Sequence, residues 1–244
     1  MSLSSFTWKF FRGLTLLILV MGVSMSSVSI LNSMSLNFFN FSSNFPWVNS
    51  FVFGFALLAS SSIAIKRQGS YRLRTVLFSG RERVSILYIA VIGVFFGVFM
   101  TLVDFLPIIY NGGIGLDYDP SLINLMGRMV YVWVLVGVSE EFLFRGLIQK
   151  SISYEPDPQV NLSLFNTSWS NVIASLLYGL SHLVNLLSKP VSFVFPQVLY
   201  TILFGLALGH VYIKSGRLVE PIIIHNLADG MEYTLEYLIY LAMT

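Results

Sequence analysis

The sequence predicts an all-α integral membrane protein, a bundle of seven or eight transmembrane helices. Only 11% of the 244 residues are charged, whereas 55% are apolar, and a soluble domain carries about 25% charged residues. The mean hydropathy of +0.76 is correspondingly high. Because so little polar surface cannot cover a water-soluble globule of this size, the membrane class follows before any motif is considered.

Seven apolar runs are long enough to cross a bilayer, which takes roughly 20 residues of helix. The last run is interrupted by Asp229, Gly230, Glu232 and Glu236. It therefore predicts either one kinked helix or two short helices, and the count is seven or eight. The runs are about 10–31, 46–65, 84–110, 122–148, 168–187, 191–213 and 218–243.

The first run also has the shape of a signal peptide. Lys9 and Arg12 precede its apolar core, and small residues occur at 24–26. We expect a retained first span instead, because the apolar stretch is long and the following spans depend on its orientation.

Charged residues between the runs predict the orientation of the chain. Six Lys and Arg residues crowd between the second and third runs, whereas segment 32–45 has no charge and segment 111–121 carries only Asp117 and Asp119. Positively charged residues stay on the cytoplasmic side of a membrane, so we expect a cytoplasmic N-terminus. The six residues are Lys66, Arg67, Arg72, Arg74, Arg81 and Arg83.

Composition excludes several classes of function. The chain has no cysteine, which excludes disulfides, thiolate nucleophiles and cysteine-based metal sites. No Lys- or Arg-rich tract is interleaved with aromatic residues as a nucleic-acid surface requires. We therefore expect the lipid bilayer, and no nucleic acid, as a partner. A single membrane domain over residues 1–244, with a motif-bearing core at about 122–243, is the simplest organisation.

The fourth run carries ionisable residues at membrane depth. A charge near the bilayer centre costs at least about 2.5–3.5 kcal/mol, so such residues persist where they are paired or used. Glu141 and Arg145 are four residues apart, so they share a helix face and can pair. Glu140 points about 100° away from Glu141. Two adjacent carboxylates in different environments allow one to act as a base and the other as a support.

Two further runs deliver polar groups. The fifth contains His182, with Asn185 almost one turn later, and the last contains His225, Asn226 and Asp229. His225 and Asp229 share a helix face. A carboxylate base, a histidine that orients water and a donor for an oxyanion are the components of peptide hydrolysis. Water would need a cavity in the bundle to reach them.

These residues give the sequence its resemblance to the CPBP intramembrane proteases, which include the type II CAAX prenyl endopeptidases and bacteriocin-processing homologues. The resemblance covers roughly residues 136–229, and the order and spacing of three motifs make it specific. The motif E-E-x-x-x-R is matched by Glu140, Glu141 and Arg145, F-x-x-x-H by His182 with Tyr178 in place of phenylalanine, and H-x-x-x-N/D by His225 and Asp229.

The resemblance implies an eight-helix bundle with a polar cavity open toward the cytoplasm, in which Glu140 and His182 activate water. It also implies that Glu141 and Arg145 support the structure or orient the substrate, and that His225 stabilises the tetrahedral intermediate. The implied substrate is a membrane-anchored or apolar peptide, prenylated or plain.

Asp229 departs from the prenyl-processing members of the family, which carry asparagine at this position. An ionised aspartate beside an oxyanion would repel it. Four explanations stay open: Asp229 is protonated, it orients His225, it binds a metal, or Asn226 supplies the donor instead.

A zinc hydrolase is the alternative to a metal-free glutamate mechanism, because zinc accepts histidine and carboxylate ligands. Its ligands would be Glu140, His182, His225 and Asp229. We expect the metal-free mechanism, without a cofactor. Other intramembrane proteases fit poorly: no H-E-x-x-H zinc motif occurs, and Ser181 points about 100° away from His182, unlike a serine nucleophile paired with a base.

Functions without catalysis also stay open. A membrane protein of this kind could provide bacteriocin self-immunity or act as a scaffold, and a transporter could use buried acids and histidines to relay protons. A peptidase needs Glu140, His182 and His225 around one substrate carbonyl. A proton relay would instead place these three residues in a row along the membrane normal.

Asn185 has two interpretations: it supports the site beside His182, or it only forms a hydrogen bond across helices. The remaining residues are interpreted as structural. Gly205 with Gly209 forms the G-x-x-x-G pattern typical of closely packed membrane helices. His210 matches no motif position.

Overall fold

The computed structural model describes residues 3–34, 36–68, 77, 83–110, 120–153, 157–163 and 165–244. Almost all of these residues are helical, so the predicted all-α class is confirmed. Six of the described helices are long and apolar enough to cross a membrane, as expected for a polytopic bundle. The exact number of seven or eight spans stays a prediction. Arg72, Arg74, Arg81, Asp117 and Asp119, on which part of the orientation rests, lie outside the described residues.

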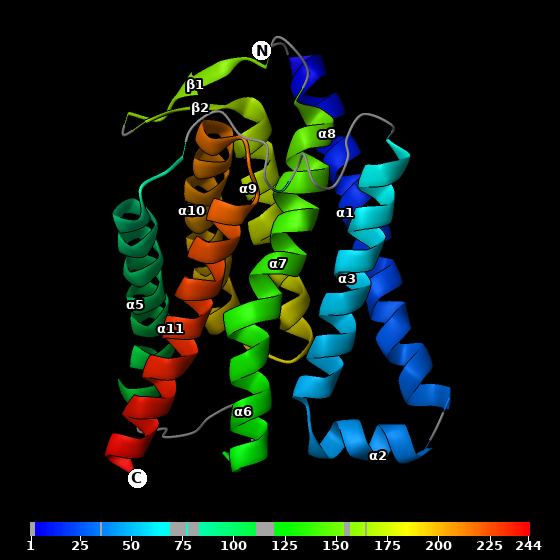
Figure 1. The fold of residues 1–244 in the computed structure, drawn as a ribbon, viewed down its shortest axis with the longest axis vertical. Helices are drawn as coiled ribbons and strands as arrows, with labels where there is room; N and C mark the ends of the chain where they lie inside the picture. Colours follow the sequence, from blue (N-terminus) through cyan, green and yellow to red (C-terminus); the bar gives the residue numbers. More distant parts are fainter. Residues whose placement is uncertain are drawn as a thin grey trace. The chain divides into compact units, whose positions relative to one another are not determined.

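Helices follow one another along the whole described chain (Figure 1). The N-terminal half holds α1 (Leu3–Met34), α2 (Leu36–Asn44), α3 (Trp47–Arg67), α5 (Ile86–Tyr110) and α6 (Leu122–Val130). Then come η1 (Tyr131–Leu135), α7 (Val136–Glu141), η2 (Phe142–Gln149), α8 (Lys150–Ile152), β1 (Gln159–Asn161), β2 (Asn166–Ser168), α9 (Trp169–Ser181), η3 (His182–Leu187), α10 (Val191–Ser215) and α11 (Val219–Met243).

The chain groups into two compact units, each of which gathers segments far apart in the sequence. The first unit comprises Met1–Val20, Ser61–Ser85 and Glu141–Pro221, and the second comprises Met21–Ser60, Ile86–Glu140 and Ile222–Thr244. Several helices contribute to both units, and the prediction of a single domain over residues 1–244 stays a prediction.

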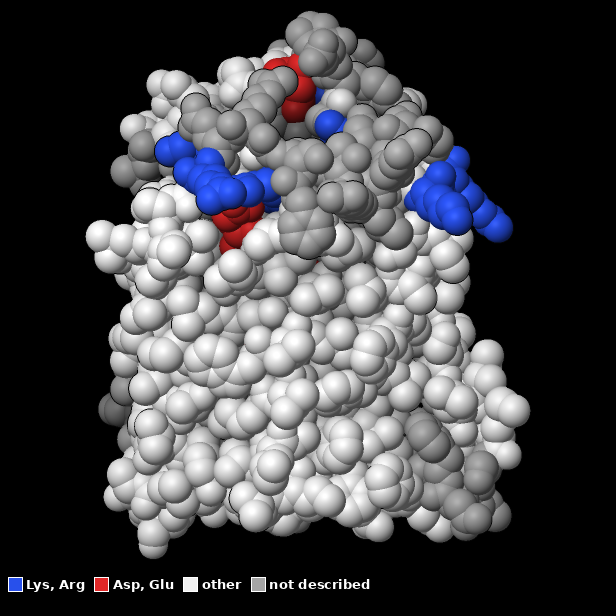
Figure 2. All heavy atoms as spheres, in the orientation of Figure 1, with Lys and Arg blue, Asp and Glu red and all other residues white. Residues whose placement is uncertain are grey.

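Charge divides unequally between the two units. Among the described Lys and Arg residues, Arg128 alone falls in the second unit, whereas five described acids do. Figure 2 shows Lys and Arg side chains gathered in one zone of the drawn face, and a broad uncharged surface elsewhere on it. An uncharged apolar surface is what lipid tails require.

In the first unit, α9 packs along α10 through the G-x-x-x-G pattern (Figure 1). A Cβ atom added to Gly205 would lie 3.1 Å from Ser175 Cβ and 3.1 Å from Tyr178 Cδ1. One added to Gly209 would overlap the side-chain amide of Asn171. The predicted close packing at Gly205 and Gly209 is therefore confirmed.

The first unit also contains a short antiparallel hairpin, β1 paired with β2, which the helical periodicity did not predict. Asp157, just before β1, accepts a hydrogen bond from Lys9 Nζ at 3.1 Å and one from Ser170 Oγ at 2.5 Å. Lys9 lies near the start of α1 and Ser170 near the start of α9. One carboxylate thus joins the ends of two helices, and the nearly buried Lys9 ammonium has a partner.

In the second unit, α11 packs against α5. A Cβ atom added to Gly97 of α5 would lie 2.6 Å from Met231 Cβ and 2.8 Å from Ala228 O. The middle of the last helix is therefore in close contact with α5 of its own unit.

Candidate active site

The helix that carries both acidic motif residues contains two π-helical segments. Helical structure continues over Leu122–Ile152, but η1 and η2 are π-helical, and the six residues of α7 lie between them. At the end of η1 the N–H of Val136 bonds to Tyr131 O, five residues back. π-helical turns are rare and occur frequently at functional sites. Glu140 and Glu141 close the short α-helical segment.

Glu141 and Arg145 form the ion pair that their spacing predicted. Arg145 Nη1 donates to Glu141 Oε1 at 2.7 Å, and the two side chains are 1% and 0% exposed. Arg145 Nη2 donates to the carbonyl of Gly205 in α10 at 2.8 Å. Its guanidinium also lies 5.2 Å from the ring centre of Tyr178 in α9. One buried arginine therefore contacts three helical segments of the first unit.

Tyr178 connects the first two motifs. Its ring meets the ring of Phe144 edge-on, with centroids 4.8 Å apart, and that of His182 edge-on at 5.2 Å. These contacts, like the one with Arg145, use the face and edges of the aromatic ring, which phenylalanine shares. The departure from the family's phenylalanine thus keeps the packing of this position.

His182 begins the 3₁₀-helix η3, directly after α9. Its Nδ1 lies 3.0 Å from the carbonyl oxygen of Tyr178. Because a carbonyl oxygen only accepts, Nδ1 carries the proton, and in the neutral ring Nε2 holds the lone pair. His182 therefore has the tautomer of a base at Nε2.

Asn185 takes the structural role that was one of its two interpretations. Its Nδ2 donates to Gln197 Oε1 at 2.7 Å. This bond ties η3 to α10 and supports the segment that begins at His182.

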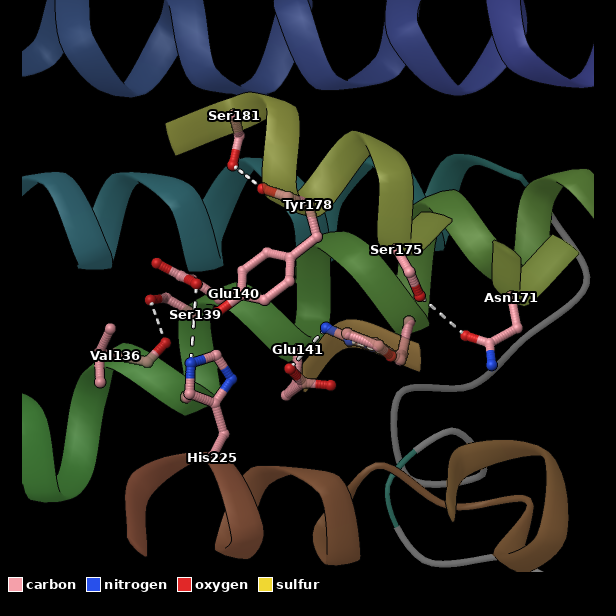
Figure 3. A network of polar contacts seen from close by, with 12 residues as sticks. Val136, Ser139, Glu140, Glu141, Asn171, Ser175, Tyr178, Ser181 and His225 are labelled. Atoms are coloured by element: carbon pink, nitrogen blue, oxygen red, sulfur yellow. Dashed lines mark hydrogen bonds and ion pairs between the residues drawn. The ribbon is translucent and has the colours of Figure 1, made fainter. Parts of the chain in front are cut away.

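The second unit brings Glu140 and His225 together (Figure 3), with Asp229 beside the same histidine. His225 Nε2 lies 3.7 Å from Glu140 Oε2 and 3.6 Å from Asp229 Oδ2. His225 is 1% exposed, whereas the side chains of Glu140 and Asp229 retain 20% and 17% exposure. Both carboxylates are beyond hydrogen-bond distance of Nε2, but they place acceptors on that side of the ring, where a proton on Nε2 would be favoured.

Asn226 uses its side-chain amide on the backbone of the helix that carries Glu140. Its Oδ1 accepts from Gly137 N at 2.8 Å, and its Nδ2 donates to Val134 O at 3.0 Å. Gly137 carried no role in the sequence interpretation. The only signal for it was a glycine three residues before the acid pair, between two valines.

The predicted site residues divide between the two units. Glu140, His225, Asn226 and Asp229 lie in the second unit. Glu141, Arg145, His182 and Asn185 lie in the first. The pairing of Glu140 with His182 on one water molecule stays a prediction. Among the described residues, no group of three or more His, Asp or Glu side chains has the arrangement needed to hold a metal ion, and the zinc alternative with Glu140, His182, His225 and Asp229 is addressed by experiment below.

Fold and site together define an α-helical, polytopic integral membrane protein whose spans carry acids and histidines. Residues 122–231 match the family model of the type II CAAX prenyl endopeptidase Rce1-like proteins, which confirms the resemblance seen in the motifs. The match covers just under half of the 244 residues and includes all three motifs. This family is a family of proteases, which supports peptidase activity on a membrane-associated peptide. No curated protein and no solved structure matches the chain.

Arg145→Met is expected to lower the free energy of unfolding by about 3–5 kcal/mol, because it leaves the buried Glu141 carboxylate without its partner. Glu141→Leu combined with Arg145→Met should recover most of that loss, since both charges are then removed. Thermal unfolding in detergent micelles measures the effect. The control is Arg67→Met at the exposed end of α3. Equal unfolding temperatures for Arg145→Met and Arg67→Met would contradict the structural role of the pair.

Proposed function

We propose that the protein is an intramembrane endopeptidase that hydrolyses a peptide bond by water activated between Glu140 and His182. The observation that carries the proposal is the meeting of the Glu140 carboxylate, the His225 ring and the Asp229 carboxylate in the second unit. A carboxylate and an N–H donor close to each other, in spans otherwise lined by apolar residues, form a site for peptide hydrolysis. The family match of residues 122–231 supports the same reaction class.

Glu140 is the proposed general base. Its side chain retains 20% exposure, so water can reach the carboxylate and give up a proton to it. The lone pair on His182 Nε2 would accept a second hydrogen bond from the same water and orient it. Hydroxide then adds to the substrate carbonyl carbon, and Glu140 returns the proton to the leaving amine as the C–N bond breaks.

His225 is the proposed donor to the tetrahedral oxyanion. Its Nε2 atom lies 3.7 Å from Glu140 Oε2 and 3.6 Å from Asp229 Oδ2 in the free protein, and catalytic hydrogen bonds often tighten only when substrate is bound. Asp229 lies one helical turn from His225, close enough for its carboxylate to orient the ring. Of the four explanations for an aspartate at this position, orientation of His225 is therefore the one we adopt.

The proposed substrate is a peptide held at the membrane, either prenylated or anchored by an apolar segment. The apolar surface of the spans gives such a substrate access through the lipid, which a fully soluble peptide would not use. We also propose that the N-terminus and the first unit border the cytoplasm, because that unit holds nearly all the described basic residues.

Glu140→Gln and His182→Gln are each expected to lower kcat by about 10²–10⁴-fold, because each removes a proton-transfer or water-orienting group. If both act on one water, the double variant should be no slower than the slower single variant. Purified protein in detergent is assayed with fluorogenic peptides, prenylated and plain.

The matched control for His182→Gln is His210→Gln, because His210 lies in α10 and its ring packs against Phe165. The His210→Gln variant should cleave like wild type. Equal cleavage by wild type and Glu140→Gln would contradict the mechanism, and absence of cleavage by wild type over a broad panel would favour a scaffold or immunity function.

Chelation should leave cleavage unchanged, and elemental analysis of the active protein should find far less than one zinc per chain. The reason is that Glu140 and the histidines supply the base and donors without a Lewis acid. Loss of activity with 1,10-phenanthroline, restored by added zinc, would instead establish the zinc hydrolase.

A single cysteine at position 68 should react with a membrane-impermeant maleimide only after the cells are permeabilised, whereas one at position 40 should react in intact cells. The chain has no cysteine of its own, and Gln68 and Asn40 are both exposed. The opposite labelling pattern would reverse the proposed orientation.

A further inference from the structure

The side chain of Asn226 in α11 forms hydrogen bonds to the backbone of the helix that carries Glu140. Where η1 passes into α7, the backbone changes from bonds that reach five residues back to the α-helical pattern. At such a change individual N–H and C=O groups lose their partners within the helix. Asn226 supplies both an acceptor, to Gly137 N at 2.8 Å, and a donor, to Val134 O at 3.0 Å.

Gly137 allows this contact because it has no side chain. A Cβ atom at this position would lie 2.5 Å from Asn226 Oδ1, 2.9 Å from His225 Cβ and 3.0 Å from Asn226 N. Real Cβ atoms do not approach other atoms so closely, so any larger residue would force the helices apart. Gly137 and Asn226 together therefore set the separation of α7 from α11.

That separation decides the geometry of the candidate site. Gly137 lies one turn before Glu140 on α7, and Asn226 is the immediate neighbour of His225 on α11. Two hydrogen bonds and a tight contact thus lie within about one turn of the Glu140–His225 contact of 3.7 Å. Groups this close to reacting atoms control their alignment.

We propose that Asn226, whose side chain packs against Gly137, is a positioning residue that keeps Glu140 and His225 aligned for catalysis. The inference rests on the proposed function, because Asn226 acts through those two residues. The side-chain oxygen of Asn226 and one of its two N–H groups already bond to the backbone, so only the second N–H group could serve the fourth explanation for Asp229, in which Asn226 is the oxyanion donor.

Asn226→Ala is expected to lower kcat roughly 100-fold with little change in KM, because the reacting groups shift while the substrate surface stays. Gly137→Ala should have a similar effect by pushing the helices apart. The double variant should also fall by roughly 100-fold rather than by the product of the two, since both changes break one contact.

The matched control is Asn124→Ala, another asparagine of the second unit, which loses a hydrogen bond to Asn44 O without touching the site. It should keep the wild-type kcat. If Asn226→Ala does not fold, Asn226→Asp serves in its place, because it keeps the size and the acceptor but turns an oxygen toward Val134 O. A folded Asn226→Asp or Asn226→Ala protein with wild-type kcat would overturn the proposal.

A second measurement does not depend on proteolysis. With ring-labelled histidine, the three histidines are assigned in NMR spectra by single His→Gln variants. Glu140→Gln should shift the His225 resonance in the wild-type background and much less in Asn226→Ala, while His210 reports an intact fold. An equal shift of the His225 resonance in both backgrounds would overturn the positioning role. This measurement can be interpreted even if wild type cleaves no peptide and the proposed function fails.

Discussion

The ion pair between Glu141 and Arg145 is the contact on which the motif-bearing part of the first unit depends. Both side chains are essentially buried, and an unpaired charge in such surroundings is very costly. Arg145 also bonds to the backbone of α10 and lies over the ring of Tyr178 in α9. Satisfying one arginine therefore requires three helical segments to adopt definite positions. Tyr178 in turn contacts His182 through its ring and its carbonyl oxygen. The same arginine therefore indirectly positions the side chain of His182.

The two neighbouring glutamates differ because the helix directs them into different surroundings. Glu141 is fully buried against Arg145, whereas Glu140 is partly exposed and faces His225. This is the division into a support and a candidate base that adjacent carboxylates allow. The two histidines also differ in their surroundings: Nδ1 of His182 lies at hydrogen-bond distance from a backbone carbonyl oxygen, whereas Nε2 of His225 faces two carboxylates.

Contacts that follow from regular helical spacing were predictable, and contacts that depend on an altered backbone were not. The i,i+4 spacing predicted the Glu141–Arg145 pair, and G-x-x-x-G predicted the close approach at Gly205 and Gly209. No periodicity indicated the π-helical segments on either side of α7, because their residues suit an α-helix equally well. The role of Asn226 was missed for the same reason: its partners are backbone groups that an unbroken α-helix would have kept for itself.

The sequence by itself determined the membrane class, the helical fold and the identity of the ionisable residues in the spans. Insertion into lipid is governed by the composition of each segment of roughly 20 residues, which can be read locally. Only the tertiary structure decided which partner each polar group takes. Glu140 and His225 are 85 positions apart in the chain, yet their side chains lie 3.7 Å apart. That contact depends on how α11 packs against Gly137, next to the π-helical segment η1. Such packing is a property of two distant segments together, and neither segment alone indicates it.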